Sequence, residues 1–143
     1  MSDALSLDNA VDDAFEAQQI PLLSKLVEQA SYTAAASDVE DAARILDQQM
    51  ESLGCQIERH DSAPGSFAAH RVYRSPGYRS DRPCPLLLGH IDTVFPRSMN
   101  FLHFSREGDV MRGPGVLDMK SGLTVIAFAL RAIRESFPKR YAQ

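Results

Sequence analysis

The sequence predicts an α/β fold in which a central mixed sheet is flanked by helices. Segments with apolar residues at helical spacing alternate with short runs of strand-forming residues. One run, LLLGHI at residues 86–91, is apolar on both faces, as expected of a central strand covered by helices on both sides. A long apolar helical segment follows it, which suits a strand-to-helix crossover. A chain of 143 residues fits a single domain.

The composition narrows the class of protein. Hydrophobic residues make up 44% of the chain and charged residues 24%, which is ordinary for a globular protein. The net charge of −4 and the lack of a basic stripe in the sequence argue against a nucleic-acid partner. The N-terminal residues are acidic where a signal peptide would be basic, and no apolar run is long enough to span a bilayer. We therefore expect a soluble, cytoplasmic protein with no membrane partner.

The spacing of apolar residues in the first part of the chain predicts helices. A weak apolar stripe over residues 8–19 is interrupted by Pro21 and continues over residues 22–30, so two helical pieces should meet near Pro21. Ser37 and Glu40 have the spacing of a capping box at the start of the next helix. Its apolar stripe runs from Val39 to Leu53, and Gly54 should end it.

Strand signals follow this helix. Residues 55–60 (CQIERH) alternate in polarity, residues 62–65 (SAPG) predict a turn, and residues 68–74 (AAHRVYR) predict an antiparallel partner strand. A short hairpin with EGD as its turn is expected within residues 99–116. Residues 120–137 are apolar almost all round and should form a buried helix that ends at Pro138, with cations near its C-terminal end.

A histidine and an aspartate stand at the end of the apolar run. Ligands of open α/β sheets bind beyond the carboxyl ends of the strands, where His90 and Asp92 are expected. A neutral imidazole is a good zinc ligand, and its second ring nitrogen usually donates to a carboxylate. Residues two apart in an extended segment face the same side, so Asp92 can reach the ring of His90. Taken alone, this pair is more typical of a structural histidine beside a turn-capping aspartate than of a metal site.

A second motif strengthens the prediction of a site. RGPGVLDMKSG at residues 112–122 places Asp118 in a glycine-bearing loop before the buried helix. Glycines permit the unusual backbone angles that a loop needs to aim one carboxylate at a shared site. A phosphate-binding P-loop is rejected, because it requires glycine where Pro114 and Met119 stand.

The remaining polar residues and cysteines are given structural interpretations. His60, His70 and His103 are expected as exposed strand residues, and Lys120 as a solvated charge or one related to a helix dipole. The acidic pairs at residues 12–13 and 40–41 should be solvated helix faces. Two cysteines are too few for a disulfide framework, and we expect both as small buried apolar residues. These are Cys55 and Cys84.

GHIDTVFP (89–96) and RGPGVLDMKSG together resemble a family of zinc-dependent amidohydrolases and exopeptidases. The family includes glutamate carboxypeptidase, aminoacylase, acetylornithine deacetylase and succinyl-diaminopimelate desuccinylase. The resemblance implies that His90 binds one zinc, that Asp92 supports catalysis by orienting His90, and that Asp118 bridges two zinc ions. It also implies a cis peptide between Asp118 and Met119, small peptides or N-acyl amino acids as substrates, and cobalt or manganese as substitutes for zinc.

The family pattern extends beyond this chain. Arg112 and Ser121 stand where the family often has an aromatic residue and a glycine. Family members continue for a few hundred residues, with the general base, the remaining metal ligands and an inserted dimerisation or lid domain. We therefore interpret residues 1–143 as the N-terminal part of a zinc-exopeptidase-like catalytic, metal-binding domain.

Two functions stay open at this point. In the first, the full-length protein is a di-zinc metallohydrolase, able to form a homodimer, that cleaves amide bonds as a peptidase or deacylase, and the chain alone is inactive. In the second, from a different class, the chain is a non-catalytic binding module that keeps the fold without a working metal site.

Overall fold

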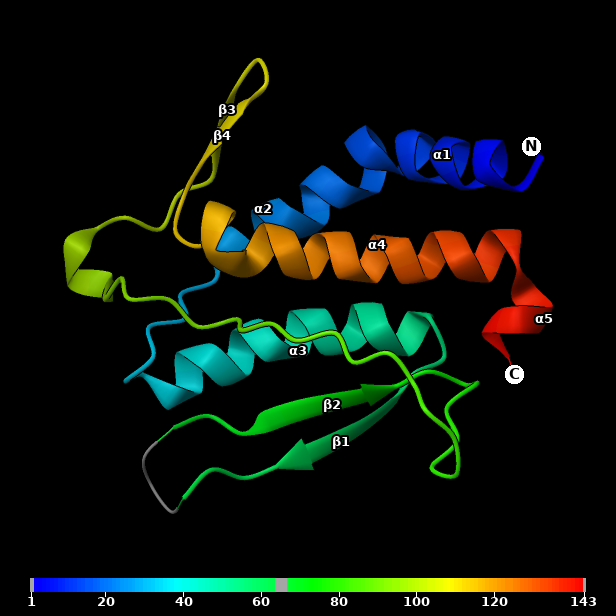
Figure 1. The fold of residues 1–143 in the computed structure, drawn as a ribbon. Coiled ribbons are helices and arrows are strands. Elements are labelled where there is room, and N and C mark those ends of the chain that lie inside the picture. Colours follow the sequence, from blue (N-terminus) through cyan, green and yellow to red (C-terminus); the bar gives the residue numbers. More distant parts are fainter. Residues whose placement is uncertain (1, 64–66, 143) are drawn as a thin grey trace.

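The computed structural model describes residues 2–63 and 67–142. Its helices stack in layers, with α4 in the middle (Figure 1). On one side of α4 (Ser121–Ser136) lie α1 (Ser2–Ala14) and α2 (Ile20–Glu28), which the π-helical turn η1 (Phe15–Gln19) joins. On the other side lies α3 (Ala36–Ser52), and beyond it the hairpin of β1 (Gln56–His60) and β2 (His70–Arg74).

The shorter elements connect these layers. A second hairpin, β3 (Ser105–Glu107) and β4 (Val110–Arg112), projects beside the C-terminal end of α2 in Figure 1. The chain then passes through the kinked turn η3 (Val116–Lys120) into α4. Two further single-turn elements are η2 (Arg97–Met99) and α5 (Pro138–Tyr141).

The predicted class of mixed helix and sheet is confirmed, and most elements lie where the sequence places them. Helical pieces meet next to Pro21, which stands in the first turn of α2 directly after the π-helical turn η1. Gly54 follows α3 with a φ of +81°, the left-handed conformation that ends helices. Both predicted hairpins form, although residues 64–66 of the first turn lie outside the described residues.

The core lies where α4 packs between α2 and α3. Its apolar side chains come from the stripes that the sequence predicts on these helices, and Leu26 and Ala127 are fully buried. Complete burial of a leucine side chain contributes about 1.5–3 kcal/mol, so these contacts hold the layers together. Other members of the core cluster are Leu22, Leu46, Met50, Leu53, Cys55, Leu123 and Phe128.

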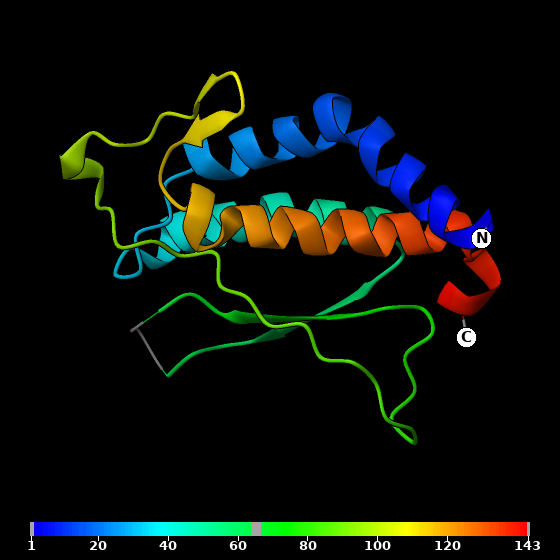
Figure 2. The same ribbon diagram turned by 45° about the horizontal axis from the view of Figure 1, so that its top comes forward.

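The central strand expected at residues 86–91 does not form. The strands of the described residues make two separate two-stranded antiparallel sheets, and residues 86–91 belong to neither. The segment is extended and runs beside β2 without pairing with it (Figure 2). Leu86, Leu87 and Leu88 are 76%, 57% and 77% exposed. The apolar pattern correctly predicts that this segment is extended. It does not show whether neighbouring strands are present, and without them the segment cannot form part of a sheet.

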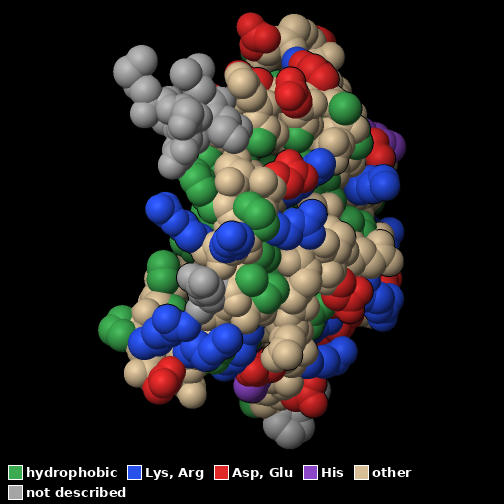
Figure 3. Space-filling model, turned by 90° about the vertical axis from the view of Figure 1, so that its right-hand side faces the viewer, with side chains coloured by type: hydrophobic (Ala, Val, Ile, Leu, Met, Phe, Trp, Pro, Cys, Tyr) green, Lys and Arg blue, Asp and Glu red, His purple; other side chains and the backbone are tan. Residues whose placement is uncertain are grey.

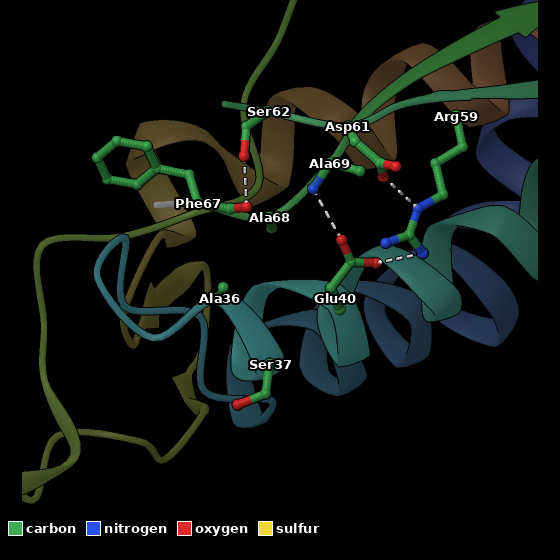
Figure 4. A pocket seen from close by; sticks show the side chains of 9 residues that line it. All are labelled: Ala36, Ser37, Glu40, Arg59, Asp61, Ser62, Phe67, Ala68 and Ala69. Atoms are coloured by element: carbon green, nitrogen blue, oxygen red, sulfur yellow. Dashed lines mark hydrogen bonds and ion pairs between the residues drawn. The ribbon is translucent and has the colours of Figure 1, made fainter. Parts of the chain in front are cut away.

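The capping box predicted at residues 37–40 is also wrong. The residue before α3 is Ala35, and no side chain caps this helix. Glu40 instead accepts hydrogen bonds from the backbone N–H of Ala69 at 2.8 Å and from Arg71 Nη2 at 2.7 Å. Figure 4 shows Glu40 pointing from α3 toward Ala69 and Arg59 across a cavity of about 460 Å³. Glu40 therefore anchors the first hairpin to α3 rather than facing solvent.

The surface is mixed in character. Figure 3 views the end of the molecule that carries both termini, where basic and acidic side chains are interspersed among apolar ones. Cys84 is exposed, which corrects the expectation that both cysteines are buried, and Cys55 is buried as expected. Within the described part of the chain, no helix combines the length and the apolar character needed to cross a bilayer.

A pair of leucine substitutions tests this fold. Leu26→Ala removes a fully buried side chain and should lower the free energy of unfolding by about 2–5 kcal/mol. Leu86→Ala is the matched control, because Leu86 is 76% exposed, and it should change that free energy by no more than about 0.5 kcal/mol. Urea denaturation of both variants measures the difference. A large loss for Leu86→Ala would mean that residues 86–91 are buried in solution.

Glu40 gives a pH-dependent prediction. Its hydrogen bond to Arg71 holds the pKa of the Glu40 carboxyl below its ordinary value of 4.5, with the Ala69 N–H and nearby charges adding to this and burial opposing it. A carboxyl whose pKa is lowered by folding stabilises the fold above pH 4.5, and that stability is lost as the pH falls through the folded-state pKa.

Glu40→Gln should therefore destabilise the chain at pH 7 by about 1–3 kcal/mol and by less at low pH. Denaturation midpoints between pH 3 and pH 7 measure the effect. Glu51→Gln, at an exposed position of the same helix, is the control and should leave the pH dependence unchanged. Equal behaviour of the two variants would contradict the assigned role of Glu40.

Candidate metal centre

His90 lies at the end of the unpaired extended segment and reaches the loop before α4. Its Nε2 atom lies 2.9 Å from Oδ1 of Asp118, which is 28 residues further along the chain. His90 and Asp118 thus converge, as the two sequence motifs predict. The side chain of His90 is 46% exposed and that of Asp118 is 83% exposed, so both are accessible to a ligand from solvent.

The second ring nitrogen of His90 faces Asp92. Nδ1 lies 3.1 Å from the backbone oxygen of Asp92 and 3.3 Å from its carboxylate Oδ1. The hydrogen bond to Asp118, together with the backbone oxygen and charge of Asp92, raises the pKa of His90 above its ordinary value, although partial burial opposes the shift. In the protonated ring both nitrogens donate, Nδ1 to Asp92 and Nε2 to Asp118, and Nε2 must lose its proton before its lone pair can bind a metal.

Close packing at two glycines supports both motifs. A Cβ atom at Gly89 would lie 2.7 Å from Cδ2 of Leu123, so a larger residue before His90 would require this side chain of α4 to move. Gly115 has a φ of +79°, and a Cβ there would lie 3.0 Å from the side chain of Lys120. The peptide between Asp118 and Met119 is cis, which confirms that expectation from the family resemblance.

The loop between α2 and α3 holds the segment that carries Asp92. Thr93 donates its backbone N–H to Ser31 O at 2.7 Å and accepts one from Thr33 N–H at 3.0 Å. Tyr32 and Thr93 accordingly form an isolated parallel β-bridge. The hydroxyl of Thr33 donates to Oδ2 of Asp92 at 2.6 Å. Asp92 therefore has one carboxylate oxygen beside His90 and the other bound to Thr33.

Lys120 holds the second motif to the same part of the chain. Its side chain is fully buried, and Nζ donates to the backbone oxygens of Leu26 at 2.6 Å and Gln29 at 2.9 Å, at the C-terminal end of α2. Burial lowers the pKa of Lys120 to about 8. The expectation of a solvated lysine is wrong, whereas the alternative of a charge related to a helix dipole agrees with these contacts. The last carbonyls of a helix lack intrahelical donors, and Lys120 supplies them.

A cavity of about 570 Å³ opens beside the pair formed by His90 and Asp92. One wall is the extended segment at residues 88–92, and the opposite wall is β2. Thr33 lies at its edge, and apolar side chains of α3 and α4 form its floor. These are Val39, Ala43, Leu46 and Leu123.

The donor atoms of His90 and Asp118 fit part of a zinc site. Zinc takes imidazole nitrogen and carboxylate oxygen at about 2.0–2.2 Å, so two ligand atoms of one ion lie within about 4 Å of each other. The observed separation of 2.9 Å meets this condition. Among residues 2–63 and 67–142, however, no three His, Cys, Asp or Glu side chains gather as a metal-binding group. The chain thus offers two ligands where a catalytic zinc usually has three.

The other histidines lie on or near strands, as expected, and one of them, His70, lines the same cavity as His90. His60, His70 and His103 are exposed, and the first two lie on β1 and β2. Sequence reasoning missed Thr33 and the buried state of Lys120. The spacing of Thr33 from Asp92 is 59 residues, so no local pattern connects them. A signal for Lys120 was present, because it is the one charged residue in the apolar stretch 113–130 apart from Asp118.

The comparisons with known proteins agree with the geometry. Residues 86–142 match the model of peptidase family M20/M25/M40, and this range contains His90, Asp92 and Asp118. Carboxypeptidase G2 from Pseudomonas sp. (strain RS-16) is 30% identical over 132 residues, which are 90% of this chain and 31% of that protein.

A solved structure shares the fold. The di-peptidase Dug1p from Saccharomyces cerevisiae superposes with a TM-score of 0.80 and 21% identity, over 95% of this chain and 32% of that one. The chain therefore spans about a third of the length of each of these relatives. The resemblance drawn from the two motifs is confirmed, and both of these proteins are peptidases by name.

The hydrogen bonds of Lys120 to the end of α2 give a prediction about stability. Lys120→Met keeps most of the side-chain volume but leaves the carbonyls of Leu26 and Gln29 without their donor. It should lower the free energy of unfolding by about 1–3 kcal/mol, the typical cost of unsatisfied buried polar groups. The matched control is Lys25→Met at an exposed position of α2, which should have little effect. Denaturation of both variants at pH 7 measures the difference, and equal stability would contradict the role given to Lys120.

Proposed function

We propose, from the match of residues 86–142 to peptidase family M20/M25/M40 and the similarity to Carboxypeptidase G2, that the chain supplies part of the metal site of a hydrolase that cleaves amide bonds. The observation that carries this proposal is the separation of 2.9 Å between His90 Nε2 and Asp118 Oδ1, which brings the two sequence motifs to one point. The proposed substrates are small peptides or N-acyl amino acids, and the names of the two relatives, a carboxypeptidase and a di-peptidase, support this class.

Each of the three polar residues has a distinct proposed role. His90 would hold a zinc ion through Nε2, and the carboxylate of Asp118 would bridge that ion and a second one. Asp92 would act through His90 by accepting from Nδ1 and so fixing the ring. Cobalt or manganese would be accepted in place of zinc, because the ligands are nitrogen and oxygen. When bound, the metal polarises the amide carbonyl and lowers the pKa of water from about 15.7 toward 7.

We further propose that the remaining ligands and the general base come from polypeptide outside these 143 residues, so that the chain is one part of a catalytic domain. Three observations support this. The described residues contribute two ligands rather than three. Three consecutive leucines are exposed along an extended segment that pairs with neither sheet, as in a sheet strand without its neighbours. The relatives are also about three times as long.

Zinc titration tests the metal site directly. The chain should bind Zn²⁺ weakly, and both His90→Ala and Asp118→Ala should abolish that binding, because each removes one of two ligands. His103→Ala removes an exposed histidine elsewhere and should leave the affinity unchanged. Isothermal titration calorimetry of the four proteins measures the effect. Wild-type affinity in His90→Ala would contradict the proposed site.

Hydrolysis separates the enzyme from the non-catalytic alternative. The 143-residue chain with zinc should not hydrolyse N-acyl amino acids or dipeptides at a useful rate, because it lacks a third ligand and a general base, and a positioned base alone contributes about 10²–10⁴-fold. A longer chain carrying the missing segments should show chelator-sensitive hydrolysis that Asp118→Ala abolishes. Chelator-sensitive turnover by the short chain would contradict the incomplete site, and an inactive longer chain would favour the binding module.

A further inference from the structure

The hydroxyl of Thr33 lies at the end of a line of polar contacts that leads to the candidate ligand. Thr33 Oγ1 donates to Asp92 Oδ2 at 2.6 Å. His90 Nδ1 lies 3.1 Å from the backbone oxygen of Asp92 and 3.3 Å from its Oδ1, and His90 Nε2 lies 2.9 Å from Asp118 Oδ1. The contacts bring together three segments that are far apart in the sequence, around residues 33, 90–92 and 118. The sequence motifs account for the last two of these segments but not for the first.

The hydroxyl proton of Thr33 has two acceptors within reach. Asp92 Oδ2 lies at 2.6 Å and the backbone oxygen of Thr93 at 3.2 Å. The shorter contact is to an ionised acceptor, and charge-assisted hydrogen bonds are about twice as strong as neutral ones, so the proton is directed to Asp92. The carboxylate is therefore fixed from the side opposite His90.

Fixing this carboxylate matters because it is partly open to water. The side chain of Asp92 is 32% exposed, and a carboxylate held at one oxygen only can turn about its terminal bond. The backbone N–H of Thr33 separately donates to Thr93 O at 3.0 Å, so the loop stays docked without the hydroxyl. The hydroxyl thus has a function that the backbone contacts do not provide.

We propose that Thr33 is a positioning residue of the metal site, which orients Asp92 and through it the ring of His90 for metal binding. This inference rests on the proposed zinc site and assigns a role to a residue outside both motifs. Carboxylates that orient ligating histidines typically change metal affinity by about 10–100-fold when they are lost. Thr33 acts one contact further out, so we expect its effect at the lower end, about 10-fold.

The experiment compares two substitutions at Thr33 in the 143-residue chain, with Zn²⁺ titration by calorimetry as the readout. Thr33→Val keeps the shape and removes the hydroxyl, and it should weaken zinc binding by about 10-fold. Thr33→Ser keeps the hydroxyl and should retain wild-type affinity. Ser52→Ala removes a hydroxyl that bonds Gln49 O on α3, away from the site, and serves as the control.

A double-mutant cycle shows whether Thr33 acts through Asp92. Asp92→Ala alone should weaken zinc binding by about 10–100-fold. In that background Thr33→Val should cause no further loss of zinc affinity, because the effects of two substitutions that remove the same interaction do not add. An equal loss in both backgrounds, or no loss from Thr33→Val in the wild-type background, would overturn the proposal.

A measurement on the metal-free protein tests the role of Thr33 separately from the proposed zinc site. The ¹⁵N spectrum of the His90 ring should show a shifted Nδ1 resonance in Thr33→Val and a wild-type resonance in Thr33→Ser. If His90→Ala and Asp118→Ala leave zinc binding intact, the proposed zinc site fails, and the ring spectrum alone decides whether Thr33 positions His90. An unchanged Nδ1 resonance in Thr33→Val would then overturn the role of Thr33.

Discussion

The position of every candidate ligand depends on how two later segments dock against the C-terminal end of α2 and the loop that follows it. From one side, Thr93 exchanges backbone hydrogen bonds with Ser31 and Thr33, which fixes the segment carrying His90 and Asp92. From the other side, buried Lys120 donates to carbonyls at the end of α2, which fixes the loop carrying Asp118. The same short stretch thus sets the distance between His90 and Asp118.

This arrangement explains how a site can form from an exposed pair of side chains. His90 and Asp118 are open to solvent, where an isolated ion pair contributes little to stability. Their separation is set by contacts behind them, chiefly those of the fully buried Lys120 and the close approach of Gly89 to Leu123. Ligands held by a rigid frame lose little freedom when a metal binds, which is the usual design of a functional site.

Local features of the structure could be predicted from the sequence, whereas features set by distant contacts could not. The helices follow from apolar periodicity, and the convergence of His90 with Asp118 follows from two motifs at the ends of a strand-like run and a loop. The apolar run at residues 86–91 also led to the incorrect prediction of a central strand. An apolar run is typical of a buried strand, but the other residues of this chain leave the run exposed. Glu40 fits a capping box by spacing, but Arg71, 31 residues later, is its partner.

The central claim is that His90 and Asp118 hold the same metal ion. A crystal structure of the chain soaked with Zn²⁺, with anomalous data collected on both sides of the zinc absorption edge, tests it most directly. The account predicts an anomalous peak at about 2.0–2.2 Å from both His90 Nε2 and a carboxylate oxygen of Asp118. A peak bound through His90 Nδ1, or one at His60, His70 or His103 with none between His90 and Asp118, would contradict it.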